Sequence, residues 1–583
     1  MSSLPVDEAA STRQQHPNAK PKTAAELNEG IPMNGAHALM KTLADAGVEV
    51  CFTNPGTSEM HFVAALDAEP RMRAVLALFE GVATGAADGY ARMTGKPAAT
   101  LLHLGCGLGN GLANLHNARK GKVPVLNIVG DHATHHVKYD AQLQSDIETV
   151  ARNVLPGFVR TSHSTAALCE DAVAALRAAR GLPGQVATLI LPADVSWGEG
   201  GKPCAPPLPP TPEAASDETV QAIADALRGG GRTVLLLGGH ALREGALRSA
   251  ARIAVHAGVQ LLAEVFPTRM ERGAGLPAIE RVAYLAELAG VQLAGAQHLV
   301  RVDAKSPVSF FAYPGKPSDL VPEGCTVHTL CSPEQDSAAS LAKLERALGA
   351  ERSEPPVAPA RRPDRPRGAL TAPKVCKAVG HLLPENAILI DEAITSGLML
   401  GVMTQGAPRH DLLTLTGGAI GQGLPNAVGA AIACPDRPVI ALVGDGSAMY
   451  TIQALWTMAR EQLHVVAIIF NNASYSVLNV ELERVGASAA STKARAQFEL
   501  NTPVLNFAQL AQSMGVHAVR ASTAEDFCQA LEYALAQPGP HLIEAMVPES
   551  LAGAKRKVLP WLLKSLPSLP PPVARALKRR IAP

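Results

Sequence analysis

A carboxylate and an amide follow two apolar runs of the sequence at a spacing that suits metal binding. Asp445 stands between two glycines that follow the run VIALV, and Asn472 is the second of two asparagines that follow the run VVAIIF. If the two runs are neighbouring parallel strands, the crossover between them returns the chain in the same direction, and both strands end at one edge of the sheet. Asp445 and Asn472 are then expected to lie close together. Carboxylate, amide and carbonyl oxygens are the ligands that Mg²⁺ takes together with phosphate oxygens and water.

The residues around this carboxylate suit a diphosphate as well as a metal. We expect a buried strand at Val439–Val443 and a crossover helix over 449–460. Gly444 and Gly446 permit a sharp turn and the close approach of a ligand to the main chain. Ser447 is expected at the start of the helix, where free N–H groups attract phosphate. GDG alone also predicts an ordinary strand-to-helix turn, but the asparagine pair after the next apolar run favours the ligand site.

The composition describes a large, apolar and electrically balanced chain. Hydrophobic residues make up 47% and charged residues 18% of the 583 residues, and the formal net charge is +0. This length predicts roughly three or four domains, and the charge balance argues against nucleic acid as the main partner. Nine cysteines without a CxxC spacing indicate neither a zinc site nor a disulfide framework. No apolar run approaches the ~18 residues of a membrane span, and the first thirty residues lack the apolar core of a signal peptide, so we expect a cytoplasmic protein.

Two proline-rich stretches divide the chain into three blocks, and in each block short apolar runs alternate with helical patterns. Continuous apolar runs between helices predict parallel sheets that are covered on both faces. The fold expected is therefore α/β, with three doubly wound parallel-sheet domains joined by proline-rich linkers. The expected boundaries are 1–31 for a disordered N-terminal segment, 32–200 for the first domain, 201–216 for a linker, 217–353 for the central domain, 354–367 for a second linker, 368–548 for the third domain and 549–583 for a basic tail.

GDGS followed by NN at the end of the next apolar run resembles the motif of thiamine diphosphate (ThDP) enzymes. The resemblance implies that Asp445, Asn472 and the main-chain carbonyl of Ser474 bind Mg²⁺, and that the diphosphate of the cofactor lies beside Gly444–Ser447 and Tyr475. By the same resemblance, the first block is the pyrimidine-binding domain, the central block is Rossmann-like, and the third block binds diphosphate and Mg²⁺.

Other segments resemble the same family. In LFEGVATGAADGYARMTGKPAAT, Glu80 is implied to lie beside N1′ of the aminopyrimidine, where it promotes the imino tautomer that deprotonates C2; a glutamate at a helix start is otherwise a favourable charge on the helix dipole. In TGGAIGQGLPNAVGAA, Ile420 is implied to be the apolar wedge between the two rings, and the carbonyl of Gly418 accepts from the 4′-amino group; the bland alternative is a loop into a helix. In DEAITSG, Thr395 and Ser396 are implied diphosphate donors, although hydroxyls that cap a helix have the same pattern.

The resemblance is to the branch that holds benzoylformate decarboxylase and the large subunit of acetolactate synthase, and it extends from about Met33 to Val547. NPGTSE places Thr57 where the decarboxylase binds the substrate carboxylate. LLHLGCGLGNGLANL places His103 as a proton donor to intermediates, although a histidine in an apolar run is otherwise a packed core residue. A second active-site histidine of the decarboxylase has no evident equivalent here.

Two segments depart from this branch. GDHATHHVKYD carries His132, His135 and His136, which suit a different proton relay but equally a solvated loop or an interface, and whose spacing resembles a metal site only superficially. In the central block, GGHALREGA is a weak glycine-rich loop. That block also lacks the glycine- and methionine-rich stretch that synthases use beside FAD, so FAD is not expected.

The resemblance implies that the C2 ylide of the cofactor attacks a 2-keto acid and that carbon dioxide leaves to give an enamine, with the cofactor as electron sink. Thr57 and His103 favour protonation and release of an aldehyde. The alternative is acetolactate synthase-like carboligation with a second 2-keto acid or an aldehyde; a ThDP-binding paralogue without turnover is a third, against which the intact Glu80 argues. The family also implies a homodimer or homotetramer with active sites between the first block of one subunit and the third block of another.

The C-terminal tail combines basic and apolar residues. AKRKVLPWLLKSLPSLPPPVARALKRRIAP carries eight Lys and Arg residues, and no acidic residue follows Glu549. Trp561, Leu562 and Leu563 beside these charges suit a membrane-surface or lid segment. The four prolines of SLPSLPPP forbid one long helix and favour a subunit-packing arm.

Overall fold

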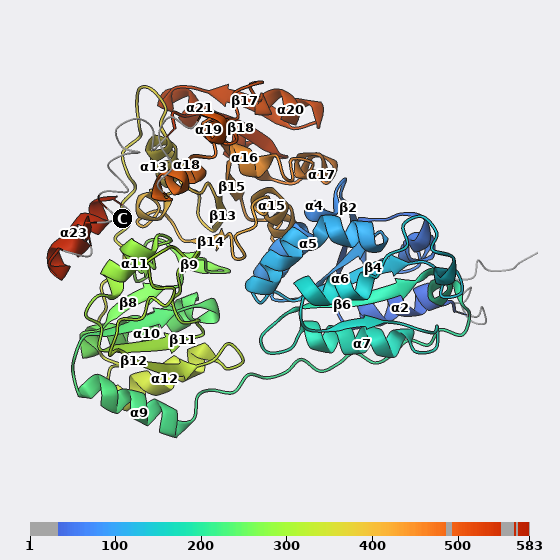
Figure 1. Ribbon diagram of the computed structural model, residues 1–583, viewed down its shortest axis with the longest axis horizontal. Coiled ribbons are helices and arrows are strands. Elements are labelled where there is room, and N and C mark those ends of the chain that lie inside the picture. Colours follow the sequence, from blue (N-terminus) through green and yellow to red (C-terminus); the bar gives the residue numbers. More distant parts are fainter. Residues whose placement is uncertain (1–32, 486–491, 550–561, 563–564, 567–568, 582–583) are drawn as a thin grey trace, which may run out of the picture.

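The computed structural model describes residues 33–485, 492–549, 562, 565–566 and 569–581. The expected disordered segment 1–31 and much of the tail, including Trp561 and Leu563, lie outside these residues. The described chain forms three α/β units, which Figure 1 shows in blue to cyan, in green to yellow, and in yellow to red. The expected architecture of three doubly wound α/β domains is confirmed.

The first unit is a parallel six-stranded sheet in the order β2-β1-β3-β4-β6-β5. Helices α4, α5 and α6 cover one face and α2, α3 and α7 cover the other, in two separate apolar clusters. Strands covered on both faces are apolar along their whole length. The elements are α2 (Gly35–Asp45), β1 (Val50–Asn54), η1 (Thr57–Glu59), α3 (Met60–Leu66), β2 (Arg73–Leu76), α4 (Glu80–Thr94), β3 (Ala98–Leu102), α5 (Leu104–Lys120), β4 (Val125–Asp131), η2 (Val137–Tyr139), α6 (Ile147–Val154), β5 (Val159–Thr161), α7 (Leu168–Ala179), β6 (Val186–Pro192) and α8 (Ala193–Trp197).

The central unit is a parallel five-stranded sheet in the order β10-β8-β7-β11-β12. The strand order reverses between β7 and β11, which is where open α/β sheets commonly bind ligands. Helices α9, α10 and α12 cover one face and α11 covers the other. The elements are α9 (Asp217–Arg228), β7 (Thr233–Leu237), η3 (Gly239–Leu242), α10 (Glu244–Ala257), β8 (Gln260–Ala263), β10 (Glu280–Arg281), α11 (Ala286–Leu293), β11 (His298–Val302), β12 (Thr326–Cys331) and α12 (Ser337–Leu348).

The third unit is a seven-stranded sheet in the order β17-β18-β16-β15-β13-β14-β9. Its edge strand β9 (Met270–Arg272) is antiparallel to β14 and comes from the stretch 217–353 that was expected to belong to the central domain. A wholly parallel sheet is therefore not what forms here. The other elements are α13 (Ala372–Leu382), β13 (Ala387–Glu392), α14 (Leu400–Met403), β14 (His410–Thr414), α15 (Gly423–Ala433), β15 (Val439–Gly444), α16 (Asp445–Ala448), α17 (Ala454–Arg460), β16 (Val465–Asn471), α18 (Ser476–Arg484), α19 (Thr492–Ala496), α20 (Phe507–Ser513), β17 (His517–Ala521), α21 (Ala524–Ala536) and β18 (His541–Met546).

The crossover between β15 and β16 is not the single helix expected over 449–460. The chain forms the short helices α16 and α17 with a turn between them. In that turn, the hydroxyl of Thr451 donates to the main-chain carbonyl of Gly421 at 2.9 Å. The turn is therefore drawn towards the loop that precedes α15, which a continuous helix would not allow.

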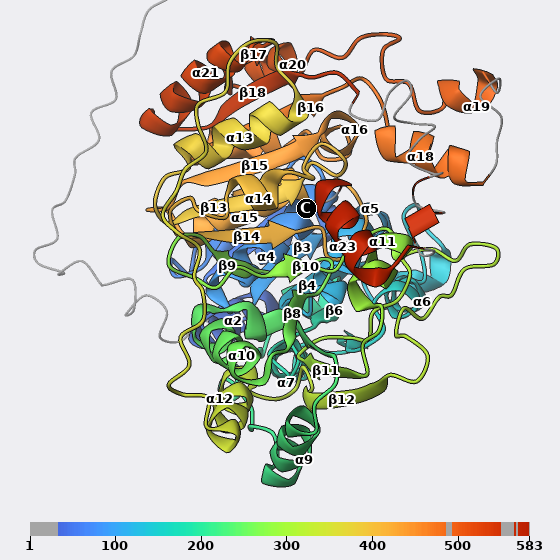
Figure 2. The same ribbon diagram turned by 90° about the vertical axis from the view of Figure 1, so that its left-hand side faces the viewer.

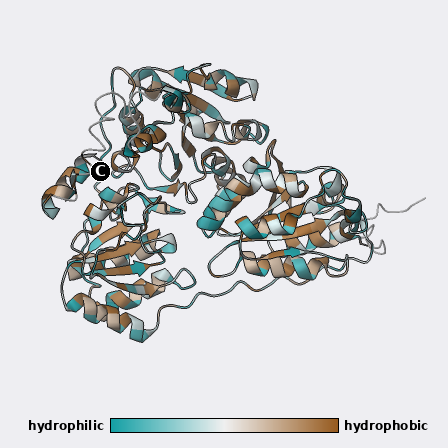
Figure 3. Ribbon diagram, in the orientation of Figure 1, coloured by the Kyte–Doolittle hydropathy of each residue, from teal (hydrophilic) through white to brown (hydrophobic). Residues whose placement is uncertain are grey.

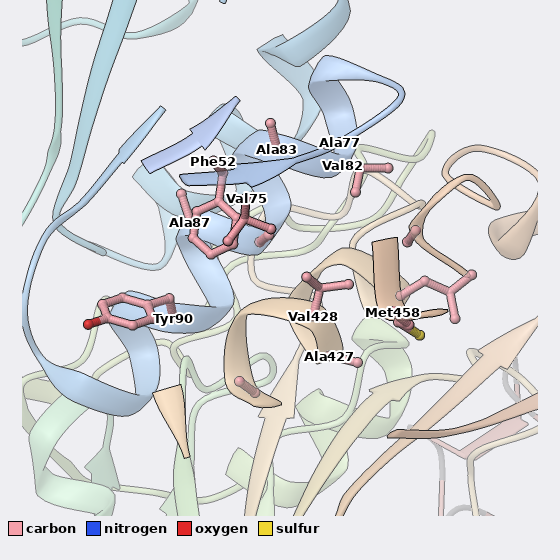
Figure 4. Close-up of a cluster of buried hydrophobic side chains, with 14 of the residues drawn as sticks. Phe52, Val75, Ala77, Val82, Ala83, Ala87, Tyr90, Ala427, Val428 and Met458 are labelled. Carbon is pink, nitrogen blue, oxygen red and sulfur yellow. The ribbon is translucent and has the colours of Figure 1, made fainter. Parts of the chain in front are cut away.

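The apolar cores of the units run into one another. Figure 4 shows Tyr90 and Ala87 of α4 near Val428 and Ala427 of α15, and all four residues belong to one buried cluster. Apolar residues concentrate on the strands of all three units (Figure 3). The linker over 201–216 contains no helix or strand and leads from the first unit to α9 (Figure 1).

The described part of the tail packs on its own chain. Helix α23 (Pro571–Ile581) lies against α11 of the central unit in both views (Figures 1 and 2). Leu566 is fully buried there beside Leu288, and Lys578 makes an ion pair with Glu280. Among the described residues, no helix is both long enough and apolar enough to cross a membrane.

Candidate active site

The structure brings Asp445 and Asn472 together at the rim of the third sheet. Strands β15 and β16 are parallel neighbours, with Gly444 opposite Phe470. One carboxylate oxygen of Asp445 accepts the main-chain N–H of Asn472 at 3.0 Å, and the other accepts the N–H of Gly446 at 2.8 Å. Asp445 is only 3% exposed. Burial raises its pKa, and main-chain N–H groups oppose that rise.

The loop after Asn472 is wrapped around this carboxylate. The side-chain oxygen of Asn472 accepts the N–H of Ser474 at 2.9 Å, and Ala473 between them has a φ of 54°, which a residue with a side chain rarely adopts. The hydroxyl of Ser474 in turn accepts from Asn479 of α18 at 3.1 Å. A buried carboxylate and a neighbouring amide oxygen form a set of hard oxygen donors, which is the chemistry that magnesium selects.

The side chain of Tyr475 explains why position 446, next to Asp445, is a glycine. A Cβ atom on Gly446 would lie 2.1 Å from Cε1 of Tyr475, so the tyrosine ring leaves room only for glycine. Gly444 has no such neighbour, because the nearest atom would be 3.7 Å away on Ser447. Helix α16 begins at Asp445, two residues before the expected start at Ser447.

Glu80 is the first residue of α4, as the sequence indicated. The side chain is nearly buried, and Oε2 accepts a hydrogen bond from the amide of Asn110 at 3.0 Å. Its other carboxylate oxygen faces Gly107, where a Cβ would come within 3.0 Å of Oε1. Asn110 was not singled out from the sequence, because an asparagine inside a glycine-rich helix carries no signal of its partner.

Helix α4, which carries Glu80, is packed unusually closely against α15 of the third unit. A Cβ on Gly429 would lie 1.9 Å from the carbonyl oxygen of Ala86, and one on Gly89 would lie 2.3 Å from that of Asn426. Both positions must therefore be glycine for the two helices to approach this closely. The spacing of these helices fixes how far Glu80 lies from the start of α15.

Buried polar groups fix the orientation of α4 relative to α15. Asp88 and Arg92 of α4 form an ion pair at 2.8 Å with both side chains fully buried. Arg92 also donates to the carbonyl of Thr414 at 2.8 Å, and Gln422 donates to Asp88. Because each charge has several partners, rotation of α4 on α15 would leave a buried charge unpaired.

Helix α5 holds the loop that contains Gly418 and Ile420. Asn117 donates to the carbonyl of Ala419 at 2.8 Å, and Asn114 donates to that of Gly421 at 3.1 Å. These asparagines follow Asn110 on the same face of the helix. One face of α5 therefore contacts both Glu80 and the loop, which places the two predicted cofactor segments side by side. Gly418 has a φ of 80°, and Ile420 is half-buried.

His103 lies directly before α5 and is paired with a carboxylate. Its Nδ1 is 2.8 Å from Oε2 of Glu59, whose side chain is completely buried. A carboxylate can only accept, so Nδ1 carries the proton and Nε2 is left for another partner. Glu59 also accepts the N–H of Gly56 at 2.7 Å, and it was missed in the sequence. Thr57 lies in the same short helix η1 and is exposed.

The comparisons with known proteins agree with this geometry. The model of the thiamine pyrophosphate enzyme N-terminal TPP binding domain matches residues 33–152, and that of the C-terminal TPP binding domain matches residues 397–545. The chain is 56% identical to a Mycobacterium tuberculosis protein with the provisional name acetolactate synthase large subunit IlvX, over 89% of this chain and 100% of that protein. It is 30% identical to benzoylformate decarboxylase of Pseudomonas aeruginosa, over 87% of this chain and 98% of that enzyme.

The chain belongs to the thiamine pyrophosphate enzyme family. It is a ThDP-dependent enzyme, a 2-keto acid decarboxylase or carboligase. The structure of the 4-hydroxybenzoylformate decarboxylase of Rhodococcus jostii RHA1 has the same fold, with a TM-score of 0.77 at 23% identity, covering 89% of this chain and 100% of that one.

The loop with Thr395 and Ser396 is a series of turns in this ThDP enzyme. Ser396 is buried and Thr395 is half-buried, and the next helix, α14, begins only at Leu400. Neither residue therefore caps a helix, which was the alternative interpretation of these hydroxyls.

The histidine cluster of this ThDP enzyme lies on a largely exposed loop after β4. The rings of His132 and His136 are 5.5 Å apart, and His135 is 3.8 Å from Asp194. Within the described part of the chain, no group of three His, Cys, Asp or Glu side chains is arranged to hold a metal ion. The geometry therefore favours a solvated loop over a metal site.

Carboxylates already occupy main-chain N–H groups at the switch point of the central unit. The N–H groups that follow β7 are already taken: that of Gly239 donates to Glu264 at 3.0 Å and that of His240 to Asp303 at 2.8 Å. Lys122 of the first unit is paired with the same Asp303 at 3.1 Å. The N–H groups of Gly239 and His240 are therefore not free donors for another ligand.

An aromatic cluster of the central unit reaches the loop of Gly418 and Ile420, and no motif in the sequence predicted this contact. A Cβ on Gly418 would lie 2.6 Å from the ring of Phe310. Phe310 packs against Tyr284 at a ring distance of 5.2 Å and against Phe266 at 6.0 Å. An apolar wall therefore stands beside the carbonyl that was predicted to accept from the 4′-amino group.

Proposed function

We propose that this enzyme decarboxylates a 2-keto acid and releases the aldehyde, using ThDP and Mg²⁺. Asp445, Asn472 and the main-chain carbonyl of Ser474 would hold the metal, and the main chain of Gly444–Ser447 would lie beside the diphosphate. The hydrogen bond from the main-chain N–H of Asn472 to Asp445, which brings the two residues together, supports this assignment. When bound, ThDP supplies an electron sink for the electrons left by the departing carbon dioxide.

Glu80 would exchange a proton with N1′ of the aminopyrimidine. Its hydrogen bond from Asn110 occupies one carboxylate oxygen and leaves the other for the cofactor. Ile420 would separate the two rings, and the carbonyl of Gly418 would accept from the 4′-amino group. The asparagines of α5 support these roles, because they fix the loop that carries both residues.

Thr57 would bind the substrate carboxylate and His103 would donate the proton that precedes aldehyde release. Glu59 supports the second role, since its bond to Nδ1 orients the imidazole and leaves Nε2 for the substrate. One observation carries the proposal: helix α5 connects two of the predicted groups of the first unit with the loop of Gly418 and Ile420. His103 precedes the helix, Asn110 donates to Glu80 from its middle, and Asn117 donates to the loop near its end.

Carboligation of a second carbonyl compound is the other candidate. The aromatic cluster of Phe310 and Tyr284 beside Gly418 supports it, because it offers an apolar contact surface to a second carbonyl compound. The 56% identical relative carries a synthase name. We also infer a homodimer or homotetramer, in line with the sequence-based expectation that the site lies between subunits.

Product analysis separates these functions. Purified enzyme with ThDP and Mg²⁺ is offered benzoylformate or pyruvate, with and without an acceptor aldehyde, and carbon dioxide, aldehyde and acyloin are measured. Aldehyde as the main product supports decarboxylation, whereas acetolactate or acyloin without free aldehyde supports carboligation. Glu80→Gln serves as the control and should abolish both. The proposal would be contradicted if Glu80→Gln still released carbon dioxide, or if the unaltered enzyme released none from benzoylformate and none from pyruvate.

A further inference from the structure

Glu392 is a buried carboxylate that belongs neither to the predicted metal-binding residues nor to the predicted acid–base residues Glu80 and His103. It is the last residue of β13, which lies between β14 and β15 in the third sheet, and it is 2% exposed. Oε1 accepts the N–H of Gly421 at 2.6 Å and that of Gln422 at 3.1 Å, and Oε2 accepts the N–H of Gly423 at 2.7 Å.

These three donors belong to the start of α15, where main-chain N–H groups have no partner within the helix. The side chain of Gln422, in the N-cap position, does not satisfy them, because it donates to Asp88 instead. Glu392 therefore caps α15 from a neighbouring strand, and a Cβ on Gly423 would leave no room for it, since that atom would lie 2.7 Å from Oε2.

The same contact fixes one end of the cofactor loop. Gly421 directly follows Ile420 and has a φ of 96°, a main-chain shape that glycine adopts readily. From the opposite side, Asn114 and Asn117 of α5 hold the carbonyls of Gly421 and Ala419. The loop is thus held by a carboxylate of its own sheet on one side and by the first unit on the other.

We propose that Glu392 is a positioning residue that holds the loop 418–421 in the shape that receives the ring portion of ThDP. This inference rests on the proposed function, because it takes that loop to be the one that contacts the aminopyrimidine. Glu392 acts through the main chain and touches no reacting atom. Its loss should therefore weaken the binding of the rings and leave the diphosphate and metal motif, on β15 and β16, undisturbed.

Calorimetry with two ligands tests this separation. Mg²⁺ with inorganic pyrophosphate reports on the metal and diphosphate motif alone, whereas Mg²⁺ with ThDP also reports on the ring site. In Glu392→Gln, an amide N–H₂ replaces one acceptor, so the Kd for ThDP should rise about tenfold or more, with that for pyrophosphate unchanged. Equal weakening of both ligands, or of neither, would overturn the positioning role.

Asp411→Asn is a matched control. Asp411 is also a buried carboxylate of the third sheet, but it pairs with Arg269 and Arg437 rather than with the loop. Its replacement should lower thermal stability without changing the ThDP-to-pyrophosphate affinity ratio. If this control changes the ratio as much as Glu392→Gln does, the effect is a general loss of packing and the proposal fails.

Hydrogen exchange of the cofactor-free protein gives a second measurement. The amides of residues 421–423 should exchange at least about tenfold faster in Glu392→Gln, because their acceptor is weakened. If these amides exchange at the same rate in both proteins, Glu392 does not fix the loop through its hydrogen bonds, and the proposal is refuted. Failure of the unaltered enzyme to bind ThDP would instead refute the proposed function, and the two failures are thereby distinguished.

Discussion

Replacing Gly429 by alanine should separate the two helices that set the position of Glu80. The new Cβ would lie 1.9 Å from the carbonyl oxygen of Ala86 and 2.5 Å from the main-chain nitrogen of Tyr90. Both atoms belong to the main chain of α4 and cannot swing aside as a flexible side chain would. The helices must therefore part by roughly 1 Å or more before an ordinary contact is restored.

The size of the effect follows from two opposing terms. Overpacking a close contact destabilises by about 1–3 kcal/mol, whereas alanine in place of glycine within a helix stabilises by about 1 kcal/mol. A net loss of about 1–2 kcal/mol is expected if the overpacking lies at the upper end, which the main-chain clash indicates. The effect on catalysis should be larger, because a misplacement of about 1 Å in a catalytic group lowers rates about 100-fold.

The assay measures kcat for carbon dioxide release together with the thermal midpoint. Gly245→Ala is the control, because Gly245 lies in helix α10 and a Cβ there meets nothing within 4 Å. The control should keep its kcat and hold or raise its midpoint, while Gly429→Ala loses about 100-fold in kcat. Wild-type kcat and midpoint in Gly429→Ala would show that the helix crossing in Figure 4 is not the one that operates in the active enzyme.

Three further changes test separate features. Glu59→Gln should lower kcat about tenfold or more, since His103 loses the charged hydrogen-bond partner that orients its ring; an unchanged kcat would contradict this. Burial raises the pKa of Glu392 to about 7 from 4.5, so the folded protein binds more protons between these values and loses stability as pH rises through them. Glu392→Gln should flatten that part of the thermal midpoint profile of the cofactor-free enzyme, and an unchanged slope would refute the assignment. Leu566→Ala should expose α23 to limited proteolysis without changing kcat, whereas Val573→Ala, at a position 52% exposed, should not; equal cleavage of both would contradict the docking of α23.

The strands and the proximity of Asp445 to Asn472 were predictable because their signals are local. Apolar runs such as Val439–Val443 form strands wherever both faces of the sheet are covered, and their parallel pairing brings Asp445 to Asn472 without further information. Strand β9 could not be predicted in the same way. Met270–Arg272 is three residues long and two of them are charged, so it becomes a strand only because β14 presents an unpaired edge.

The partners of the site residues were not predictable, because they depend on tertiary contacts between distant residues. Glu59 stands in a segment that was recognised for Thr57, yet its bond to His103 joins residues 44 positions apart. Glu392 lies next to the loop of Thr395 and Ser396, and nothing in DEAITSG tells a solvated carboxylate from one that caps a helix of another crossover. In each case the residue type is visible in the sequence, and only packing decides its role.

The contact between α4 and α15 also leads to a test of where the active site lies. None of its hydrogen bonds involves the linker 201–216, so two copies that exchange their first units would keep every one of them. Glu80 belongs to the first unit and Asp445 to the third, and each of Glu80→Gln and Asp445→Asn should inactivate the enzyme alone. If sites form between subunits, co-expression of the two variants gives mixed dimers in which one site is intact, and a fraction of the activity returns. If each site forms within one chain, every site keeps one substitution and no activity returns. Restored carbon dioxide release therefore supports the subunit-interface site, and its absence in verified mixed dimers would refute it.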